Sequence, residues 1–87
     1  MNTIYKFEFK LEDNFSLLLT KKARILSIQI QNGEFVAWVL LNTSDAIVKR
    51  SFQIYGTGHT MPEDLSKHIY LKTIQDGGSV WHIFEII

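Results

Sequence analysis

The sequence contains no cysteine and only one proline. Without cysteine, disulfide bonds and thiolate metal sites are excluded, and the redox compartment stays open. No apolar run approaches the length of a membrane span. The start, MNTIYKFEFK, is charged and alternating, unlike the continuous apolar segment of a secretory signal. We therefore expect a soluble, cytoplasmic protein without a membrane partner.

An excess of charge of either sign is also missing, because nine Lys and Arg balance nine Asp and Glu. Proteins that bind the phosphate backbone usually carry a basic segment, and here only Lys21, Lys22 and Arg24 form a cluster. Non-specific nucleic-acid binding is therefore not expected. Zero net charge lowers the barrier to self-association, so a homodimer is a partner to consider.

The dominant pattern in the 87 residues is a period of two, in a chain that is 46% apolar. This length predicts one domain, residues 1–87, with a single core. Alternation and turn residues predict strands over 4–11, 15–20, 24–31, 34–41, 47–55, 68–75 and 79–86. Seven short strands predict an all-β fold, a small antiparallel β-sandwich or barrel. The alternative is one curved sheet that dimerises through its spare face.

The strongest local signal is Asn32-Gly33, where both residues tolerate the positive φ of a type I′ hairpin turn. This turn sets a register in which Leu26 faces Val39. One hairpin face is then apolar, and consists of Leu26, Ile28, Ile30, Phe35, Ala37, Val39 and Leu41.

The opposite hairpin face carries Trp38 among Gln29, Gln31 and Ser27. Trp38 can stack on a base or ring while the glutamines offer donors and acceptors, so these residues are candidate ligand-binding groups. The structural alternative is that the first strand or a second sheet covers Trp38, because tryptophan is highly buried on average.

Three further features of the later strands give structural expectations. Both faces of 68–75 and 79–86 carry bulky residues, which predicts a strand pair covered on both sides. Arg50 falls on the apolar side of its strand, so we expect it at the rim with its head in water. His68 is expected to be a strand-entry residue.

The stretch IYGTGHTMPED follows the fifth strand. Gly56, Thr57 and Gly58 can expose amides in a concave nest that holds phosphate or carboxylate, and His59 beside them is the best functional histidine. The alternative is a plain turn that needs glycine for positive φ.

Thr60 and Glu63 have the spacing of a capping box, and Pro62 suits a first helical turn. We therefore predict one short helical turn near Pro62, extending to Ser66.

The three histidines show no ligand spacing, so neither a metal site nor a cofactor is predicted. His82 alternates with apolar residues and is expected to be a hydrogen-bonded core or rim histidine. The serines form no nucleophile motif, so an enzyme is not expected. The remaining catalytic hypothesis uses His59 or His82 as a base beside Glu63 and Asp64.

Four stretches together, TIYKF, ARILSIQIQNGE, FQIYGTGHTMPED and VWHIFEI, resemble a family of small uncharacterised proteins encoded by tailed phages and prophages. The most specific pieces are IYGTGH followed by MP, and VWH.FE. The resemblance implies a bacterial host cytoplasm and an accessory role, and it brings no catalytic residue. This chain has LTKKA where the family pattern has a Pro-Gly turn, so a partner at that edge can differ.

These observations lead to one functional hypothesis and one alternative. The hypothesis is a non-enzymatic accessory binding module that antagonises a host system, an anti-defence candidate, by masking a host protein or sequestering a nucleotide-like small molecule. The alternative is a structural, virion-associated β protein that self-assembles.

Overall fold

The computed structural model describes residues 1–87 and contains seven β-strands and no helix. All seven predicted strands are confirmed, and their bounds differ from the expected ranges only at the ends. The structure accordingly has no helix that is long and apolar enough to cross a membrane. The strands are β1 (Asn2–Phe9), β2 (Asn14–Thr20), β3 (Arg24–Gln31), β4 (Glu34–Asn42), β5 (Ile47–Gly56), β6 (His68–Asp76) and β7 (Ser79–Ile86).

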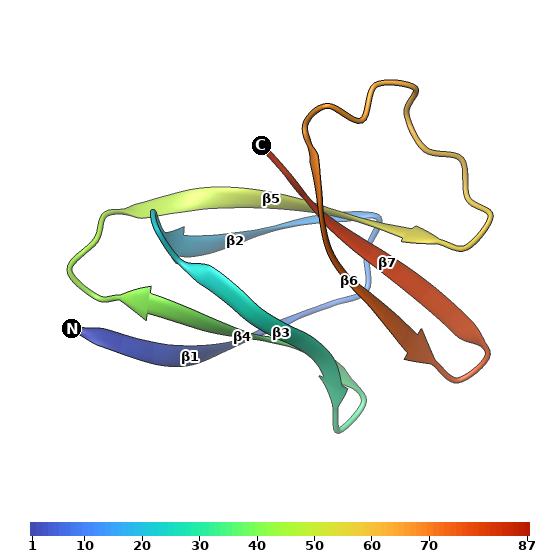
Figure 1. Cartoon of the computed structure of the whole chain (residues 1–87). Helices are drawn as coiled ribbons and strands as arrows, with labels where there is room; N and C mark the ends of the chain where they lie inside the picture. The colour runs from blue at the N-terminus through green and yellow to red at the C-terminus, as the bar shows by residue number, and fades with distance from the viewer.

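The strands form two antiparallel sheets, one in the order β1-β4-β3 and one in the order β2-β5-β7-β6. The chain passes from one sheet to the other after β1, after β2 and after β4 (Figure 1). The sheets do not close on each other, so the fold is a sandwich and not a barrel. Consequently each sheet keeps two edge strands.

Two-residue turns join the hairpins. Asn32 has a φ of 52° and Gly33 a φ of 80°, which confirms the predicted turn with two positive φ angles. Gly77, with a φ of 59°, lies in the turn between β6 and β7. The hairpin sequences thus fix these two strand pairs locally.

A β-bulge at Leu26 changes the register of β3. Ile25 pairs with Val39 and Ser27 with Trp38, so the predicted pairing of Leu26 with Val39 is wrong. Ile25 packs against the core instead, and Leu26 is 45% exposed. A bulge moves the side chains that follow it to the opposite face of the sheet. Counted from the Asn32-Gly33 turn, the predicted alternation therefore holds as far as Ser27 and fails at Leu26 and Ile25.

A second bulge, at Leu71, has the same effect in β6. It puts Leu71 and Ile74 both on the core side, with Ile83 of β7. Tyr70 lies opposite Phe84 on the other face and is 56% exposed. The prediction that this strand pair is covered on both sides is therefore wrong.

The core lies between the sheets and includes a ladder of phenylalanines. Phe9 stacks on Phe15 with ring centroids 4.3 Å apart, and Phe15 stacks on Phe52 at 5.0 Å. Phe35 contacts Phe9 at 5.5 Å. Phe9 and Phe35 belong to the three-stranded sheet, and the other two to the four-stranded sheet. The ladder therefore holds the layers together, and each of its three buried rings, those of Phe9, Phe35 and Phe52, contributes about 1.5 to 3 kcal/mol.

Arg50 lies on the core side of β5 near the rim, as expected, but its head is mostly enclosed, and the side chain is 18% exposed. Its Nε and one terminal nitrogen donate to the two carboxylate oxygens of Glu85 at 2.6 and 2.7 Å. The other terminal nitrogen donates to the Ala23 carbonyl at 2.6 Å. Hydrogen bonding to Glu85 raises the pKa of Arg50. The pair ties β5 and β7 to the connection that leads into β3.

The predicted helical turn near Pro62 is wrong, because residues 57–67 form a loop without a helix. The Asp64 carboxylate accepts a hydrogen bond from the Ser66 amide at 2.9 Å, and the Leu65 carbonyl accepts one from His68 at 3.0 Å. Asp64 thus closes a local turn that competes with a helix start.

Candidate functional site

The outward face of the three-stranded sheet carries Trp38, Gln29 and Gln31, as the hairpin register predicts. Trp38 in β4 lies between Lys6 of β1 and Ser27 of β3. The neighbouring residues in β4 point into the core, so Trp38 points away from the second sheet. Its own sheet leaves it half-buried. The core is thus complete without this tryptophan.

Polar side chains beside Trp38 are ordered by hydrogen bonds. Lys6 Nζ donates to Gln31 Oε1 at 3.2 Å, and these two residues reach across β4 from its two neighbours. Val36, which β4 presents on the same face, is only 1% exposed. Gln29 Nε2 donates to the Ser27 hydroxyl at 2.9 Å. The face therefore offers a half-buried indole beside amides and a cation.

The glycine loop begins where β5 ends, and His59 folds back on Gly56. The Gly56 amide donates to His59 Nδ1 at 3.1 Å, and the His59 amide donates to the Gly56 carbonyl at 3.0 Å. A Cβ on Gly56 would lie 2.8 Å from the imidazole, so close approach explains this glycine. Positive φ, the expected reason for glycine, occurs at Gly58 with 88°.

Most amides of the glycine loop are already used within the protein. Gly56 and His59 donate as described, and the Thr57 amide donates to the Val80 carbonyl at 3.3 Å. A nest of free N–H groups is therefore not present in this conformation, and side chains are the groups left for a ligand. The binding role of Gly56, Thr57, Gly58 and His59 stays a prediction.

His59 lines two shallow hollows. The first, of about 290 Å³, includes Asn14 and Tyr55, and the second, of about 320 Å³, includes Ser79 and Trp81. The His59 ring meets Trp81 edge-on, with centroids 6.4 Å apart. No hydrogen bond joins His59 to Glu63 or Asp64, so the catalytic hypothesis gains no support from this geometry.

A chain of hydroxyl and imidazole groups runs from the glycine loop over the outward face of the four-stranded sheet. His82 contacts the Thr57 hydroxyl through Nε2 at 2.8 Å and the Thr73 hydroxyl through Nδ1 at 3.0 Å. The Thr73 hydroxyl in turn meets the Tyr70 hydroxyl at 2.7 Å. His82 is therefore hydrogen-bonded as expected, but on an outer face.

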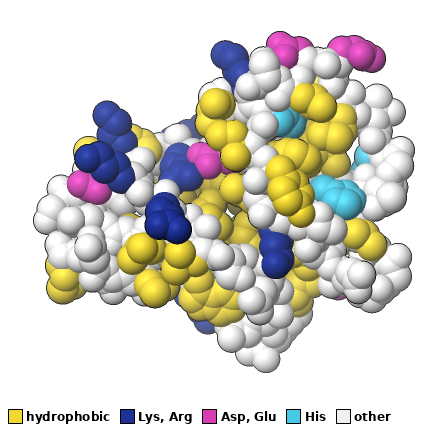
Figure 2. All heavy atoms as spheres, viewed as in Figure 1, with side chains coloured by type: hydrophobic (Ala, Val, Ile, Leu, Met, Phe, Trp, Pro, Cys, Tyr) yellow, Lys and Arg dark blue, Asp and Glu magenta, His cyan; other side chains and the backbone are white.

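His68 belongs to the same face and has more contacts than a strand-entry residue needs. Its Nε2 meets the Tyr55 hydroxyl at 2.9 Å, and Tyr55 also bonds Gln53. Both rings pack edge-on against Phe84. Figure 2 shows hydrophobic and histidine side chains together over β6 and β7. This cluster could not be predicted from the sequence, because β5, β6 and β7 come together only in the folded sheet.

The predicted ligand-binding residues thus fall into two separate groups. Trp38, Gln29 and Gln31 share the three-stranded sheet, whereas the glycine loop belongs to the four-stranded sheet. Trp38 lines none of the five main surface hollows. One ligand pocket that uses both groups is therefore not formed.

The whole chain, residues 1–87, matches a family model described as Domain of unknown function (DUF7352). The chain belongs to this family. Comparisons with curated proteins and with solved structures gave no significant match. The family description carries no activity, so the function of this DUF7352 domain has to be inferred from its surfaces.

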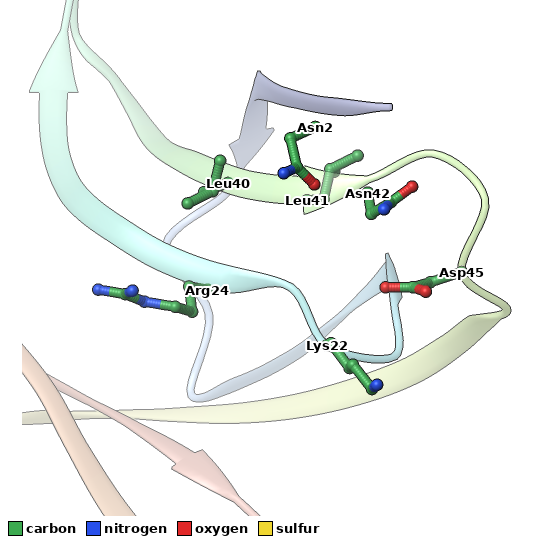
Figure 3. Close-up of a pocket in the computed structure, with 7 residues that line it drawn as sticks. All are labelled: Asn2, Lys22, Arg24, Leu40, Leu41, Asn42 and Asp45. Carbon is green, nitrogen blue, oxygen red and sulfur yellow. The ribbon is translucent and has the colours of Figure 1, made fainter.

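One hollow of the DUF7352 domain, of about 300 Å³, collects charged residues at the end of the sandwich. Figure 3 shows Asp45 directed into this space from the β4–β5 connection, with Lys22 below it and Arg24 directed away. Asp45 forms no ion pair with either cation. No group of three or more His, Asp or Glu side chains is placed to hold a metal ion.

Proposed function

We propose that this DUF7352 domain is a non-enzymatic binding module that covers a partner protein with the outward face of its three-stranded sheet. One observation carries the proposal: Trp38 lies half-buried at the centre of a face that the second sheet does not cover, so part of the indole reaches the surface. Tryptophan is among the residues most enriched at the energetic centres of protein interfaces. The core packs without it, so the indole is left available to a partner.

The shape of the face favours a protein over a small molecule. Sites that sequester small ligands usually bury about 70 to 90% of them in a cleft, whereas Trp38 lines no main hollow of this domain. The ordered pair of Lys6 and Gln31 gives a polar rim beside the indole. Such an arrangement is typical of a preformed interface. Sequestration of a nucleotide-like molecule is the second form of the proposal.

The biological setting of the proposal comes from the sequence resemblance. The motifs IYGTGH and VWH.FE are similar to those of tailed-phage and prophage proteins, which supports an accessory module that antagonises a host system in the bacterial cytoplasm. Masking a host protein requires only a surface, so a sequence without a nucleophile motif fits this role.

Affinity capture from bacterial lysate tests the masking form, with three baits compared quantitatively. We expect a partner that the wild type and Tyr70→Ala recover and that Trp38→Ala loses. Tyr70 is the matched control, because it is an exposed aromatic residue on the other sheet. Circular dichroism confirms that each bait is folded. A partner recovered equally by Trp38→Ala, or no reproducible partner at all, overturns the proposal.

The small-molecule form is tested by thermal shift against mono-, di- and cyclic nucleotides. A bound ligand at about 100 times its Kd stabilises the native state by about 2.7 kcal/mol. We expect any such shift to disappear in Trp38→Ala. No shift with any nucleotide removes this form and leaves the masking form.

A virion-associated, self-assembling protein is the second candidate function, and one observation favours it. β2 is an edge strand without a charged residue, and Leu18 in it is 68% exposed. Mass analysis of purified particles decides this candidate. Absence of the chain from the particle excludes it.

A further inference from the structure

Three of the four edge strands are protected against pairing with another strand, and β2 is not. Exposed edges are normally blocked by charged side chains, proline or a bulge. β1 carries Lys6 and Glu8, β3 begins with Arg24 and has a bulge, and β6 has Lys72 and a bulge. β2 has no charged residue, no proline and an unbroken register with β5.

The main chain of β2 presents free groups along its open edge. The Asp13 carbonyl accepts from the Ile54 amide, and the Lys21 amide donates to the Ala46 carbonyl. In an antiparallel ladder, every second residue of a strand forms main-chain hydrogen bonds with the neighbouring strand. The odd-numbered residues from Asp13 to Lys21 therefore bond to β5. The N–H and C=O groups of Ser16 and Leu18 therefore face outward, where no strand pairs with them.

An apolar groove of about 350 Å³ lies along the same edge, between β1 and β2. Three of its lining side chains are unusually exposed: Tyr5 at 48%, Leu18 at 68% and Ile47 at 70%. The groove is also lined by Thr20, which is 7% exposed and whose hydroxyl has no hydrogen-bond partner. A buried hydroxyl without a partner costs about 1 to 3 kcal/mol, so an additional polar group at this place stabilises the fold.

The charged residues on either side of β2 indicate which molecule supplies this additional polar group. Glu12 and Asp13 precede the strand, and Lys21 and Lys22 follow it, in the sequence EDNFSLLLTKK. All four side chains are exposed, and none forms an ion pair within the chain. Acids at one end and bases at the other are complementary to a second copy that runs antiparallel.

We propose that two copies of this chain pair antiparallel through their β2 edges, about a two-fold axis at Leu17. Ser16 of one copy then pairs with Leu18 of the other through the free main-chain groups. Asn14 lies opposite Thr20, and its amide supplies the partner that the Thr20 hydroxyl lacks.

In the same register, Asp13 faces Lys21 of the second copy and Glu12 faces Lys22. These are isologous contacts, because each is repeated by the two-fold axis. The two four-stranded sheets become one continuous sheet, and the second copy closes the mouth of the groove beside Tyr5. The Trp38 face stays free in this dimer, so the inference is independent of the proposed masking function, and it shares the exposed β2 edge with the self-assembly candidate.

Sedimentation velocity over a range of concentrations tests the inference. We expect a species of twice the 10.1 kDa chain mass, with at least a roughly tenfold weaker association in Leu18→Lys. Leu26→Lys is the matched control, an exposed leucine on a distant bulge, and it leaves the association constant unchanged. A wild type that stays monomeric at about 1 mM overturns the inference. A dimer that tolerates Leu18→Lys but not Lys6→Glu also overturns it, because the interface is then at β1.

Charge reversal tests the register. Asp13→Lys alone places two cations together, because the new side chain faces Lys21 of the second copy. Lys21→Asp alone places two acids together, so each single variant weakens the dimer at least roughly tenfold. The double variant Asp13→Lys/Lys21→Asp restores the opposite charges and brings the association constant back towards the wild-type value. Failure of the double variant to recover, with both single variants folded by circular dichroism, overturns the proposed register.

Discussion

The ion pair of Arg50 and Glu85 leads to the most quantitative prediction. Arg50 donates to both carboxylate oxygens of Glu85 and to one main-chain carbonyl, and the two side chains are 18% and 11% exposed. Glu85→Gln keeps the shape of the side chain but removes the charge. The guanidinium is then left without a counter-ion at a site that water reaches poorly.

The expected loss of unfolding free energy is about 3 kcal/mol, because breaking a fully buried pair costs about 3 to 5 kcal/mol and this pair is slightly exposed. The total stability of a domain of this length is about 4 to 13 kcal/mol, so the loss is a large fraction of it. For a chain of this size, about 1 kcal/mol shifts Tm by about 4 to 8 °C, which predicts a decrease of about 12 to 24 °C.

Urea unfolding followed by circular dichroism measures this loss. The matched control is Glu8→Gln, since Glu8 is 3.8 Å from Lys6 and its side chain is 61% exposed. A surface pair of this kind contributes at most about 1 kcal/mol. The double variant Arg50→Met/Glu85→Leu removes both charges and loses less than Glu85→Gln. The reasoning is refuted if Glu85→Gln lies within about 0.5 kcal/mol of the wild type, or if Glu8→Gln is equally damaging.

Three further substitutions test other parts of the fold. Gly56→Ala displaces the His59 ring, whose nearest atom would be 2.8 Å from the new Cβ, and should cost about 1 to 2 kcal/mol in urea unfolding; no loss contradicts the packing of this ring. Hydrogen bonds from Ser66, first from its hydroxyl and then from its amide, lower the pKa of Asp64. The stabilisation of the folded state by this carboxylate is therefore present above the ordinary pKa of Asp64. It is lost as pH falls through the lower pKa that Asp64 has in the folded protein. Carboxyl NMR titration should show the lowered pKa in the wild type and a higher one in Ser66→Ala, and identical values exclude this cause. Leu26→Ser should cost less than about 0.5 kcal/mol because the bulge exposes the side chain, whereas a loss of about 2 to 5 kcal/mol would place Leu26 in the core.

The candidate site was predictable in part. Trp38, Gln29 and Gln31 share one face because the Asn32-Gly33 turn fixes the register up to Ser27. The contacts of His68 with Tyr55 were not predictable, because they join strands that the chain brings together across an eleven-residue loop. No local pattern marks such a pair.

The sequence by itself determined the seven strands, the type I′ turn and the residues of most of the core, since these follow from alternation and from glycine or asparagine at positive φ. Only the tertiary structure decided the division into two sheets, the two bulges, the partner of Arg50 and which face of the Trp38 hairpin the other sheet leaves uncovered. The physical reason is that alternation specifies two faces of a strand, but packing against distant strands selects which face is covered. A bulge inserts one residue without any strong sequence signal, and that single residue reverses every side chain beyond it.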